Sequence, residues 1–312
     1  MSTFDIAIAG ELNLDLILYG LPEQMPTERE LLASRFEMTL GSSSAILAHN
    51  LAALGSRVGF ITKVGDDELG EMALARLGAA GVDLTRTVRS EGTGSGITVI
   101  LPHERERHIL TFLGTISELR SHDLDFEYLT SARHFHLSSL FLQRGLSEHV
   151  PEIFRRMKSA GLTTSLDTND DPDDRWEGVL DTTIPHVDIL LPNEREAMKM
   201  ARTDDFETAV ARLSERVKTV VVKMGSRGAM AIQGGRRFVA PAVRVDVVDP
   251  VGAGDSFDAG FLDQFLRGAD LQSCLAFGNL CGAFSTTACG GTEAFRDSKA
   301  TKEFFRKHGA FV

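Results

Sequence analysis

The order of apolar and polar residues predicts strands that alternate with helices. Six short apolar runs have the length of buried strands, and most end at a glycine or a polar residue. They occupy residues 4–10, 57–65, 132–140, 163–169, 186–193 and 219–225. The helical patterns between them stop at Gly55, Gly78 and Gly161, and glycine just beyond a helix is a usual C-terminal stop. This rhythm predicts an α/β fold with a mainly parallel sheet and helices on both faces.

Two segments, residues 31–40 and 94–111, follow a different pattern. Their alternation is typical of strands with one apolar face, and the second segment resembles two strands around a polar turn at residues 102–106. We expect them to form a small β layer that projects from the main body. The alternative is a pair of ordinary hairpins on that body.

Composition narrows the classes of partner. The 312 residues carry a formal net charge of −11, so the chain lacks the global positive field that favours nucleic acid or an anionic membrane surface. No apolar run approaches the ~18 residues of a membrane span, and the first residues do not have the pattern of a secretory signal. Cys274, Cys281 and Cys289 fit neither a zinc site nor a redox pair. We therefore expect a cytoplasmic protein.

The most informative stretch is DPVGAGDSFDAGF, residues 249–261. Residues 243–249 before it alternate and predict a strand, and a helical apolar pattern follows it as far as Gly268. A turn at this position would leave the N–H groups of Gly252, Ala253 and Gly254 free at a helix start, where they form an anion site. Asp255 beside it is suited to act as a base toward a hydroxyl that attacks a phosphate. The alternative is that Asp255 only caps the helix.

This stretch resembles the C-terminal signature of the ribokinase-like (phosphofructokinase-B type) carbohydrate kinases. Five further segments resemble that family's motifs in the same order, over most of the chain. They are GELNLDL (10–16), GSSSAILAHNLAALG (41–55), KVGDDELG (63–70), LLPNEREA (190–197) and VVVKMGSRGA (220–229). Asp167 and Asn169 also match an Asp-x-Asn that the family has at a strand end. The ordered set is more specific than any one member of it.

The resemblance implies a single domain, residues 1–312, with a doubly wound, mainly parallel sheet flanked by helices and a small β-sheet lid formed by residues 11–40 and 94–112. It implies transfer of the γ-phosphoryl of ATP to a hydroxyl of a small sugar, such as ribose, fructose or another ketosugar. Asp255 would be the base, and the N–H groups of Gly252, Ala253 and Gly254 would hold the charge of the transferring group.

The resemblance also assigns ligands to residues. The sugar would meet Asn13, Asp15, Gly41, Ser42, Ser43 and Asp255. The nucleotide would meet Asn193, Lys223, Gly225, Ser226, Gly228, Gly252, Gly254 and Asn279. Asn193 and Glu196 would position Mg²⁺ through water. A monovalent cation, K⁺ in many members, would lie beside Asp249 and the backbone near Val251, Ala288 and Gly291.

The chain departs from the family pattern at the sugar-binding turn. Ser42 replaces a second glycine, Ser43 stands where ribokinases often have lysine, and Ile46 replaces an asparagine. The substrate therefore need not be ribose, and a nucleoside kinase of the same family is an alternative. A non-catalytic sugar-binding module is a further alternative, because a fold does not fix a function. The apolar alternation of the lid also suggests a homodimer formed through it.

Several candidates also have plainer interpretations. Asn193 and Glu196 match a helix capping box, and Asn13 with Asp15 would serve as turn residues. Lys223 would serve as a solvated strand end. Asp167 and Asn169 would serve as loop caps, and His134 and His136 would have a structural role on one strand. The basic residues near 105 would form a solvated hairpin tip.

Overall fold

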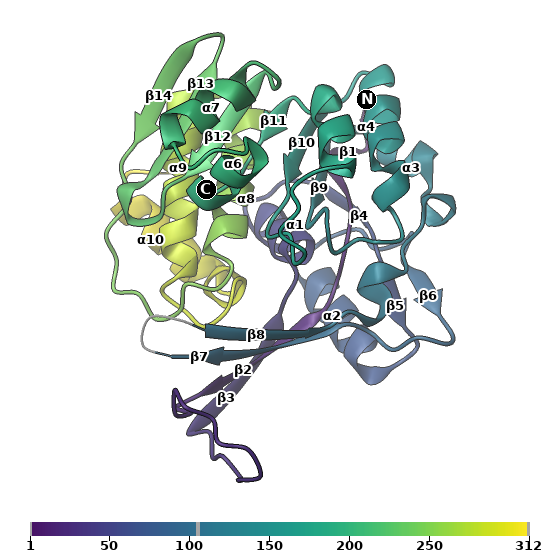
Figure 1. Cartoon of the computed structure of the whole chain (residues 1–312), viewed down its shortest axis with the longest axis vertical. Coiled ribbons are helices and arrows are strands. Elements are labelled where there is room, and N and C mark those ends of the chain that lie inside the picture. Colours follow the sequence, from purple (N-terminus) through teal and green to yellow (C-terminus); the bar gives the residue numbers. More distant parts are fainter. Residues whose placement is uncertain (1, 104–106, 311–312) are drawn as a thin grey trace.

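A computed structural model describes residues 2–103 and 107–310, and it contains one large sheet with helices on both faces (Figure 1). The sheet has eight strands. In spatial order they are β14 (Arg236–Ala240), β13 (Ala229–Gln233), β12 (Thr219–Lys223), β11 (Ile189–Leu190), β10 (Thr163–Asp167), β9 (Ala132–Ser138), β1 (Phe4–Ala9) and β4 (Val58–Ile61). The strands from β12 to β4 pair in parallel, and β13 and β14 add an antiparallel edge. The expected fold class is thus confirmed.

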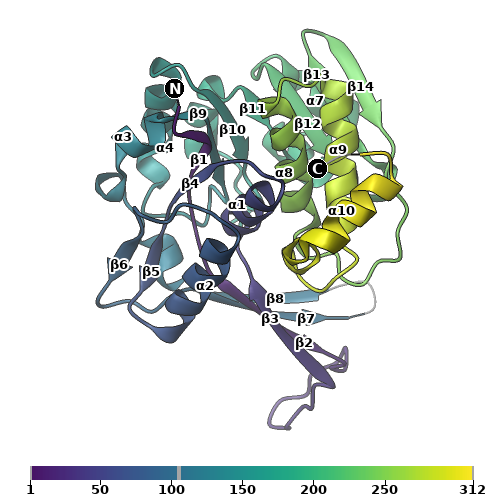
Figure 2. The same cartoon turned by 180° about the vertical axis from the view of Figure 1, so that it is seen from behind.

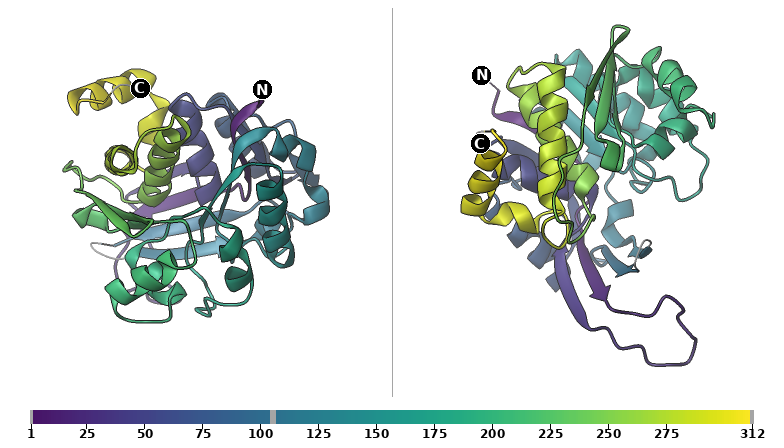
Figure 3. Two further views of the ribbon diagram at one scale, coloured as in Figure 1. Left: turned by 90° about the horizontal axis from the view of Figure 1, so that it is seen from above. Right: turned by 90° about the vertical axis from the view of Figure 1, so that its left-hand side faces the viewer.

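One face of the sheet is covered by five helices, and their apolar sides share a core with the strands. They are α3 (Phe126–Thr130), α4 (Val150–Ser159), α5 (Val179–Thr183), α6 (Glu194–Met200) and α7 (Phe206–Ser214). Trp176 belongs to this core: it is 2% exposed and packs edge-on against Phe141. The view from above separates this helical layer from the one on the opposite face (Figure 3).

The opposite face carries the helices that bear the glycine turn and the sugar-binding turn. They are α1 (Ser43–Ala53), α2 (Glu68–Ala79), α8 (Ala253–Leu266) and α9 (Leu271–Ser285), and they form a second core with the strands. Helix α10 (Ser298–Lys307) adds a small aromatic cluster beside α9, as seen from behind in Figure 2. Side-chain caps begin many of these helices, among them Ser42 at α1 and Asp67 at α2, as serine and aspartate commonly do.

A separate four-stranded sheet projects from the body, at the position expected for the lid. Its order is β3 (Arg35–Leu40), β2 (Leu14–Tyr19), β7 (Ile97–Pro102) and β8 (Arg107–Phe112). The connection between β2 and β3 extends far beyond the rest of the molecule (Figure 3). The pairing places Asp15, Thr39, Thr98 and Thr111 on one face. The predicted hairpin therefore forms as β7 and β8, while the predicted basic tip near residue 105 lies outside the described residues.

Short elements connect these layers. A third sheet pairs β5 (Lys63–Gly65) with β6 (Val88–Ser90). The single-turn helices are η1 (Gly114–Ser117), η2 (Ser121–Asp123), η3 (Ser147–His149), η4 (Ile184–His186), η5 (Gly225–Arg227) and η6 (Glu293–Arg296). No helix within residues 2–103 and 107–310 combines the length and apolarity needed to cross a bilayer.

Three of the predicted boundaries are wrong. The run at residues 57–65 divides into β4 and β5, which belong to different sheets. Helix α2 continues through Gly78 to Ala79, and it is Gly81, with φ of +93°, that takes the left-handed conformation after it. Residues 243–249 form no strand, because no strand in the described part of the chain pairs with them. Val247 and Val248 are exposed to solvent. The glycine turn therefore follows an extended loop, not a strand.

Candidate active site

The glycine turn is held by close backbone packing. Gly252 has φ of +72°, and a Cβ added to it would lie 2.4 Å from the Cα of Gly291. The oxygen of Gly291 in turn accepts hydrogen bonds from Asn50 Nδ2 at 3.0 Å and Ser256 Oγ at 3.3 Å. Helix α8 begins at Ala253, so the first N–H groups of the helix have no partner within it. A helix N-terminus of this kind can bind an anion, and its use for that purpose stays a prediction.

Asp255 lies in the first turn of α8, where a helix dipole favours a negative charge. Ser43 at the start of α1 lies close enough to favour the ionised form of its carboxyl group. Burial, followed by the negative charge of Asp167, raises the pKa of Asp255 to about 6, against the opposing effects of Lys223 and Ser43. A carboxyl group with this pKa is ionised at neutral pH and accepts a proton more readily than an ordinary aspartate, as a general base requires.

Asn13 and Asp15 face this turn from the lid sheet. Asn13 Nδ2 donates to Asp15 Oδ1 at 3.2 Å and to Thr98 Oγ1 at 3.3 Å. Gly41 allows the approach, because a Cβ there would lie 2.0 Å from Asp15 Oδ1. Burial raises the pKa of Asp15 to about 7, and the nearby charge of Asp255 adds to this effect. The two carboxylates are therefore close enough for their charges to interact.

The two serines of the sugar-binding turn have different environments. Ser42, with φ of +68°, caps α1 by accepting from Ala45 N, and its hydroxyl donates to the backbone of Glu11. Ser43 accepts from Asn169 Nδ2 at 2.7 Å, and Asn169 also donates to Ser139 Oγ at 3.1 Å. Ser43, Asn169 and Ser139 thus gather beside Asp255, whereas the hydroxyl of Ser42 is used within the protein.

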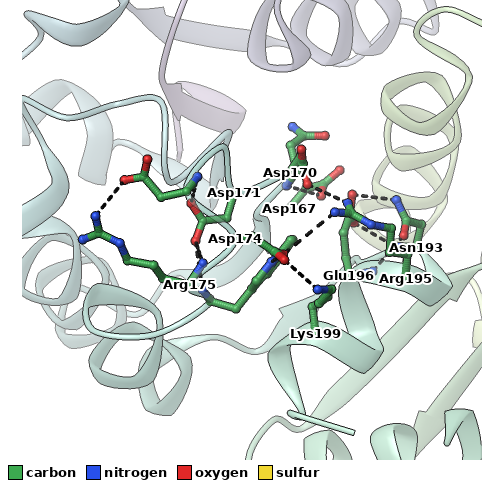
Figure 4. A network of polar contacts seen from close by, with 12 residues as sticks. Asp167, Asp170, Asp171, Asp174, Arg175, Asn193, Arg195, Glu196 and Lys199 are labelled. Carbon is green, nitrogen blue, oxygen red and sulfur yellow. Dashed lines mark hydrogen bonds and ion pairs between the residues drawn. The ribbon is translucent and has the colours of Figure 1, made fainter. Parts of the chain in front are cut away.

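Asn193 and Glu196 form a reciprocal capping box at the start of α6. Asn193 N donates to Glu196 Oε2 at 2.8 Å and Glu196 N donates to Asn193 Oδ1 at 2.9 Å. Burial, followed by the charge of Asp167, raises the pKa of Glu196 to about 7. Figure 4 shows this pair beside two ion pairs that connect α6 with the loop between β10 and α5. They join Arg195 to Asp170 at 2.6 Å and Lys199 to Asp174 at 2.7 Å.

Lys223 is not a solvated strand end. Its Nζ lies 2.7 Å from Asp167 Oδ2 and 3.1 Å from Asp258 Oδ2, and both carboxyl groups are almost fully buried. A Cβ added to Gly254 would lie 3.6 Å from the same Nζ. The ammonium group is therefore directly beneath the glycine turn.

The predicted nucleotide segment follows β12. Gly225 and Ser226 are exposed in η5, and Gly228 has φ of +92°. A Cβ at Gly228 would lie 2.1 Å from the oxygen of Ala240, so glycine is required where β14 ends. Asn279 on α9 donates from Nδ2 to the oxygens of Ala240 and Pro241, at 3.0 and 3.1 Å. These residues line the region between β12, the end of β14 and α9.

Among the residues predicted for a monovalent cation, Asp249 contacts Val251 and also Gly290, the neighbour of Gly291. Its Oδ1 accepts from Val251 N at 3.0 Å, and its Oδ2 accepts from Gly290 N at 3.0 Å and from the Tyr19 hydroxyl at 3.2 Å. Tyr19 belongs to β2, so this carboxylate connects the lid sheet, the glycine turn and the segment that precedes η6. The occupation of this loop by K⁺ stays a prediction.

Three further polar residues at the site were not singled out from the sequence. Thr98 contacts Asn13, Asp258 contacts Lys223, and Glu11 accepts from Ser44 Oγ at 2.7 Å. Glu11 and Asp258 stand as acids within otherwise apolar patterns, which is the signal that could have identified them. His134 and His136 are buried in a chain of hydrogen bonds with Ser165. Burial lowers the pKa of both to about 3, so they are neutral and structural.

Comparison with known proteins identifies the family. The model of the pfkB family of carbohydrate kinases matches residues 3–297. The chain belongs to the pfkB family. This confirms the resemblance inferred from the glycine turn and its accompanying motifs, and it confirms the expected class of enzyme, a phosphotransferase with an alcohol group as acceptor.

Individual pfkB relatives match along nearly the whole chain. An ATP-dependent ribose-1-phosphate kinase of Halopiger xanaduensis is 32% identical over 92% of this chain and 93% of its own length. A ribokinase of Arabidopsis thaliana is 29% identical over 96% of this chain and 81% of its own length. The crystal structure of a putative ribokinase II from E. coli in complex with ATP and Mg²⁺ superposes with a TM-score of 0.86, covering 98% of this chain and all of that one, at 24% identity. This last likeness confirms the fold.

Proposed function

We propose that the chain transfers the γ-phosphoryl group of ATP to a hydroxyl of a small sugar, with Asp255 as the base. The observation that carries the proposal is the position of Asp255. It lies in the first turn of α8, directly after Gly252 and Gly254 of the glycine turn, and near Ser43 at the start of α1. A hydroxyl that meets Asp255 is thereby next to an anion-binding turn.

The chemistry of the groups around Asp255 suggests a role for each of them. Asn13, Asp15, Ser43 and Asn169 supply donors and acceptors for sugar hydroxyls. The N–H groups of Gly252, Ala253 and Gly254 hold the charge of the transferring phosphoryl group, and Asp255 accepts the proton that the acceptor hydroxyl loses. Phosphoryl transfer depends mainly on such positioning and charge stabilisation. Gly225, Ser226, Gly228 and Asn279 would lie along the nucleotide.

Mg²⁺ fits Asn193 and Glu196 through water better than through direct bonds. In the described part of the chain, no three His, Cys, Asp or Glu side chains gather into a metal site, and Mg²⁺ commonly keeps several waters. When bound, the ion would neutralise phosphate charge. Glu196 would orient its water, and Asn193 would hold Glu196 in place through the capping box. We place this reaction in the cytoplasm, since ATP is the donor and the three cysteines are free thiols.

The test is an assay of ADP release with ribose, deoxyribose, fructose, ribose 1-phosphate and nucleosides. The wild-type protein should turn over at least one sugar. Asp255→Asn should keep the fold and bind ATP normally, but lose about 10²–10⁴-fold in kcat, which is the usual contribution of a general base. Turnover of nucleosides alone would replace the sugar with a nucleoside acceptor. Wild-type rates in the variant would remove Asp255 from the role of base.

We further propose that two copies pair through the outer face of the lid sheet. The register places Phe36, Leu110 and Phe112 on the face opposite Asp15, and each is more than half exposed. Exposed apolar clusters of this kind commonly mark protein interfaces. Sedimentation should give a dimer for the wild type and a monomer for Leu110→Asp, with Glu152→Gln on α4 as a control that remains dimeric. A monomeric wild type would exclude the interface.

A further inference from the structure

Beneath the glycine turn, two buried carboxyl groups lie against a single ammonium group. Asp167 at the end of β10 and Asp258 on α8 share the single ammonium group of Lys223, at 2.7 and 3.1 Å. The side chains are 1%, 2% and 13% exposed in the same order. Two ionised carboxylates and one ammonium would leave a net negative charge in the interior. Such a charge is costly to bury, and it would stand beside the phosphates of the nucleotide.

A proton on one of the two carboxyl groups removes this excess of negative charge. Asp258 Oδ1 is buried and accepts no hydrogen bond within residues 2–103 and 107–310. The carboxyl groups of Asp258 and Asp167 are within hydrogen-bonding reach of each other. Burial raises the pKa of Asp258 well above its usual range, although Lys223 opposes this effect. Burial alone would lower the pKa of Lys223, but the charges of Asp167 and Asp258 reverse this effect and raise it. The group is then neutral as a whole, with Lys223 charged, Asp167 ionised and Asp258 protonated.

Building on the proposed function, we propose that Lys223 is a positioning residue. Its ammonium group compensates the one carboxylate charge that Asp167 and Asp258 share. The group of three side chains beneath the glycine turn is thereby kept neutral and fixed. The three residues come from β10, β12 and α8, so their contacts also attach the first two turns of α8 to the sheet. Lys223 therefore serves phosphoryl transfer without itself being a ligand of the nucleotide. Without this lysine, Asp167 would repel both the triphosphate and the charge that gathers at Gly252–Gly254.

The proposed charge balance predicts a different activity for variants that keep it and variants that break it. Asp167→Asn and Asp258→Asn should each lose much less kcat/KM than Lys223→Met, because the remaining carboxylate still balances Lys223. Lys223→Met should lose at least about 30-fold, since truncating one partner strands a buried charge. The double variant Lys223→Met/Asp167→Asn is neutral again and should recover most of that loss. Asp167→Asn/Asp258→Asn leaves the ammonium uncompensated and should be impaired.

The experiment measures kcat, KM for ATP, KM for the sugar and thermal unfolding for these five proteins and the wild type. Lys199→Met removes an exposed lysine that pairs with Asp174 at 2.7 Å, and it should behave as wild type. Recovery in Lys223→Met/Asp167→Asn supports the proposal, even if Lys223→Met alone does not fold. A double variant as impaired as Lys223→Met, with a raised KM for ATP, would overturn it and make Lys223 a direct nucleotide ligand. A wild type without kinase activity would instead reject the proposed function itself.

Discussion

Substituting Gly252 and Gly254 by alanine should have opposite effects, although only one residue separates them. At Gly252 the backbone is left-handed, with φ of +72°, and the new Cβ would meet the Cα of Gly291 at 2.4 Å. An L-residue in this conformation costs about 1–2 kcal/mol. The contact must also widen by at least 0.6 Å to reach 3.0 Å, the lower bound of real Cβ contacts. The neighbour is backbone that accepts hydrogen bonds from Asn50 and Ser256, so the turn itself must move.

A displacement approaching 1 Å at a reacting centre costs about 10²-fold in rate. We therefore expect Gly252→Ala to lose about 10²-fold in kcat and to unfold at a lower temperature. At Gly254 the nearest neighbours of the new Cβ belong to the flexible Lys223 side chain, Nζ at an ordinary 3.6 Å and Cδ and Cε at 3.9 Å, and the residue lies inside α8. Gly254→Ala should gain about 0.5–1 kcal/mol of stability from helix propensity and keep most of its activity.

The assay is steady-state ADP release together with thermal unfolding of both variants under the same conditions. A Gly252→Ala protein with wild-type kcat would show that the close contact with Gly291 does not position the turn. Equal losses in the two variants would point to a requirement for glycine that has nothing to do with backbone conformation. Either result would refute the reasoning from the two Cβ positions.

Three further predictions concern the pH dependence of catalysis, the binding of the sugar and the stability of the core. The rate constant kcat/KM should fall as pH is lowered through about 6, because Asp255, with its raised pKa, must be ionised to accept a proton; a pH–rate profile without this limb would contradict its role. Asn169→Ala removes the amide that donates to Ser43 and Ser139, so it should raise KM for the sugar about tenfold, as expected for one lost hydrogen bond, and leave KM for ATP nearly unchanged. Trp176→Ala should cost about 3–5 kcal/mol of unfolding free energy in urea titrations, with little change in kcat for the folded protein, because Trp176 lies in the core behind the sheet.

The fold could be predicted because its signals are local. Apolar runs of strand length and helices between them identify a doubly wound sheet, and the alternation in residues 94–112 identifies β7 and β8. Residues 243–249 show the limit of this reasoning. Their alternation is the same as that of a strand, but a strand also needs a neighbour, and that depends on the tertiary structure. In the folded chain Asp249 is buried and Val247 and Val248 face solvent.

The site was partly predictable for a similar reason. Motifs with short spacing, such as Asn13 with Asp15 or Asn193 with Glu196, can be recognised within one segment. The environment of Lys223 cannot, because its partners Asp167 and Asp258 lie 56 and 35 residues away along the chain. The contact of Trp176 with Phe141 is likewise a tertiary one, 35 positions apart in the sequence. Partnerships across the sheet are long-range, and sequence pattern alone does not encode their distances.

The contact between Gly252 and Gly291 also bears on which fragments of the protein could work. The residues proposed for the sugar begin at Asn13, whereas the backbone that supports the glycine turn includes Gly290 and Gly291. A fragment cut before Gly290 would carry every proposed catalytic group but would lack the support for the turn. Such a fragment should therefore be inactive, even when the sheet and its helices fold.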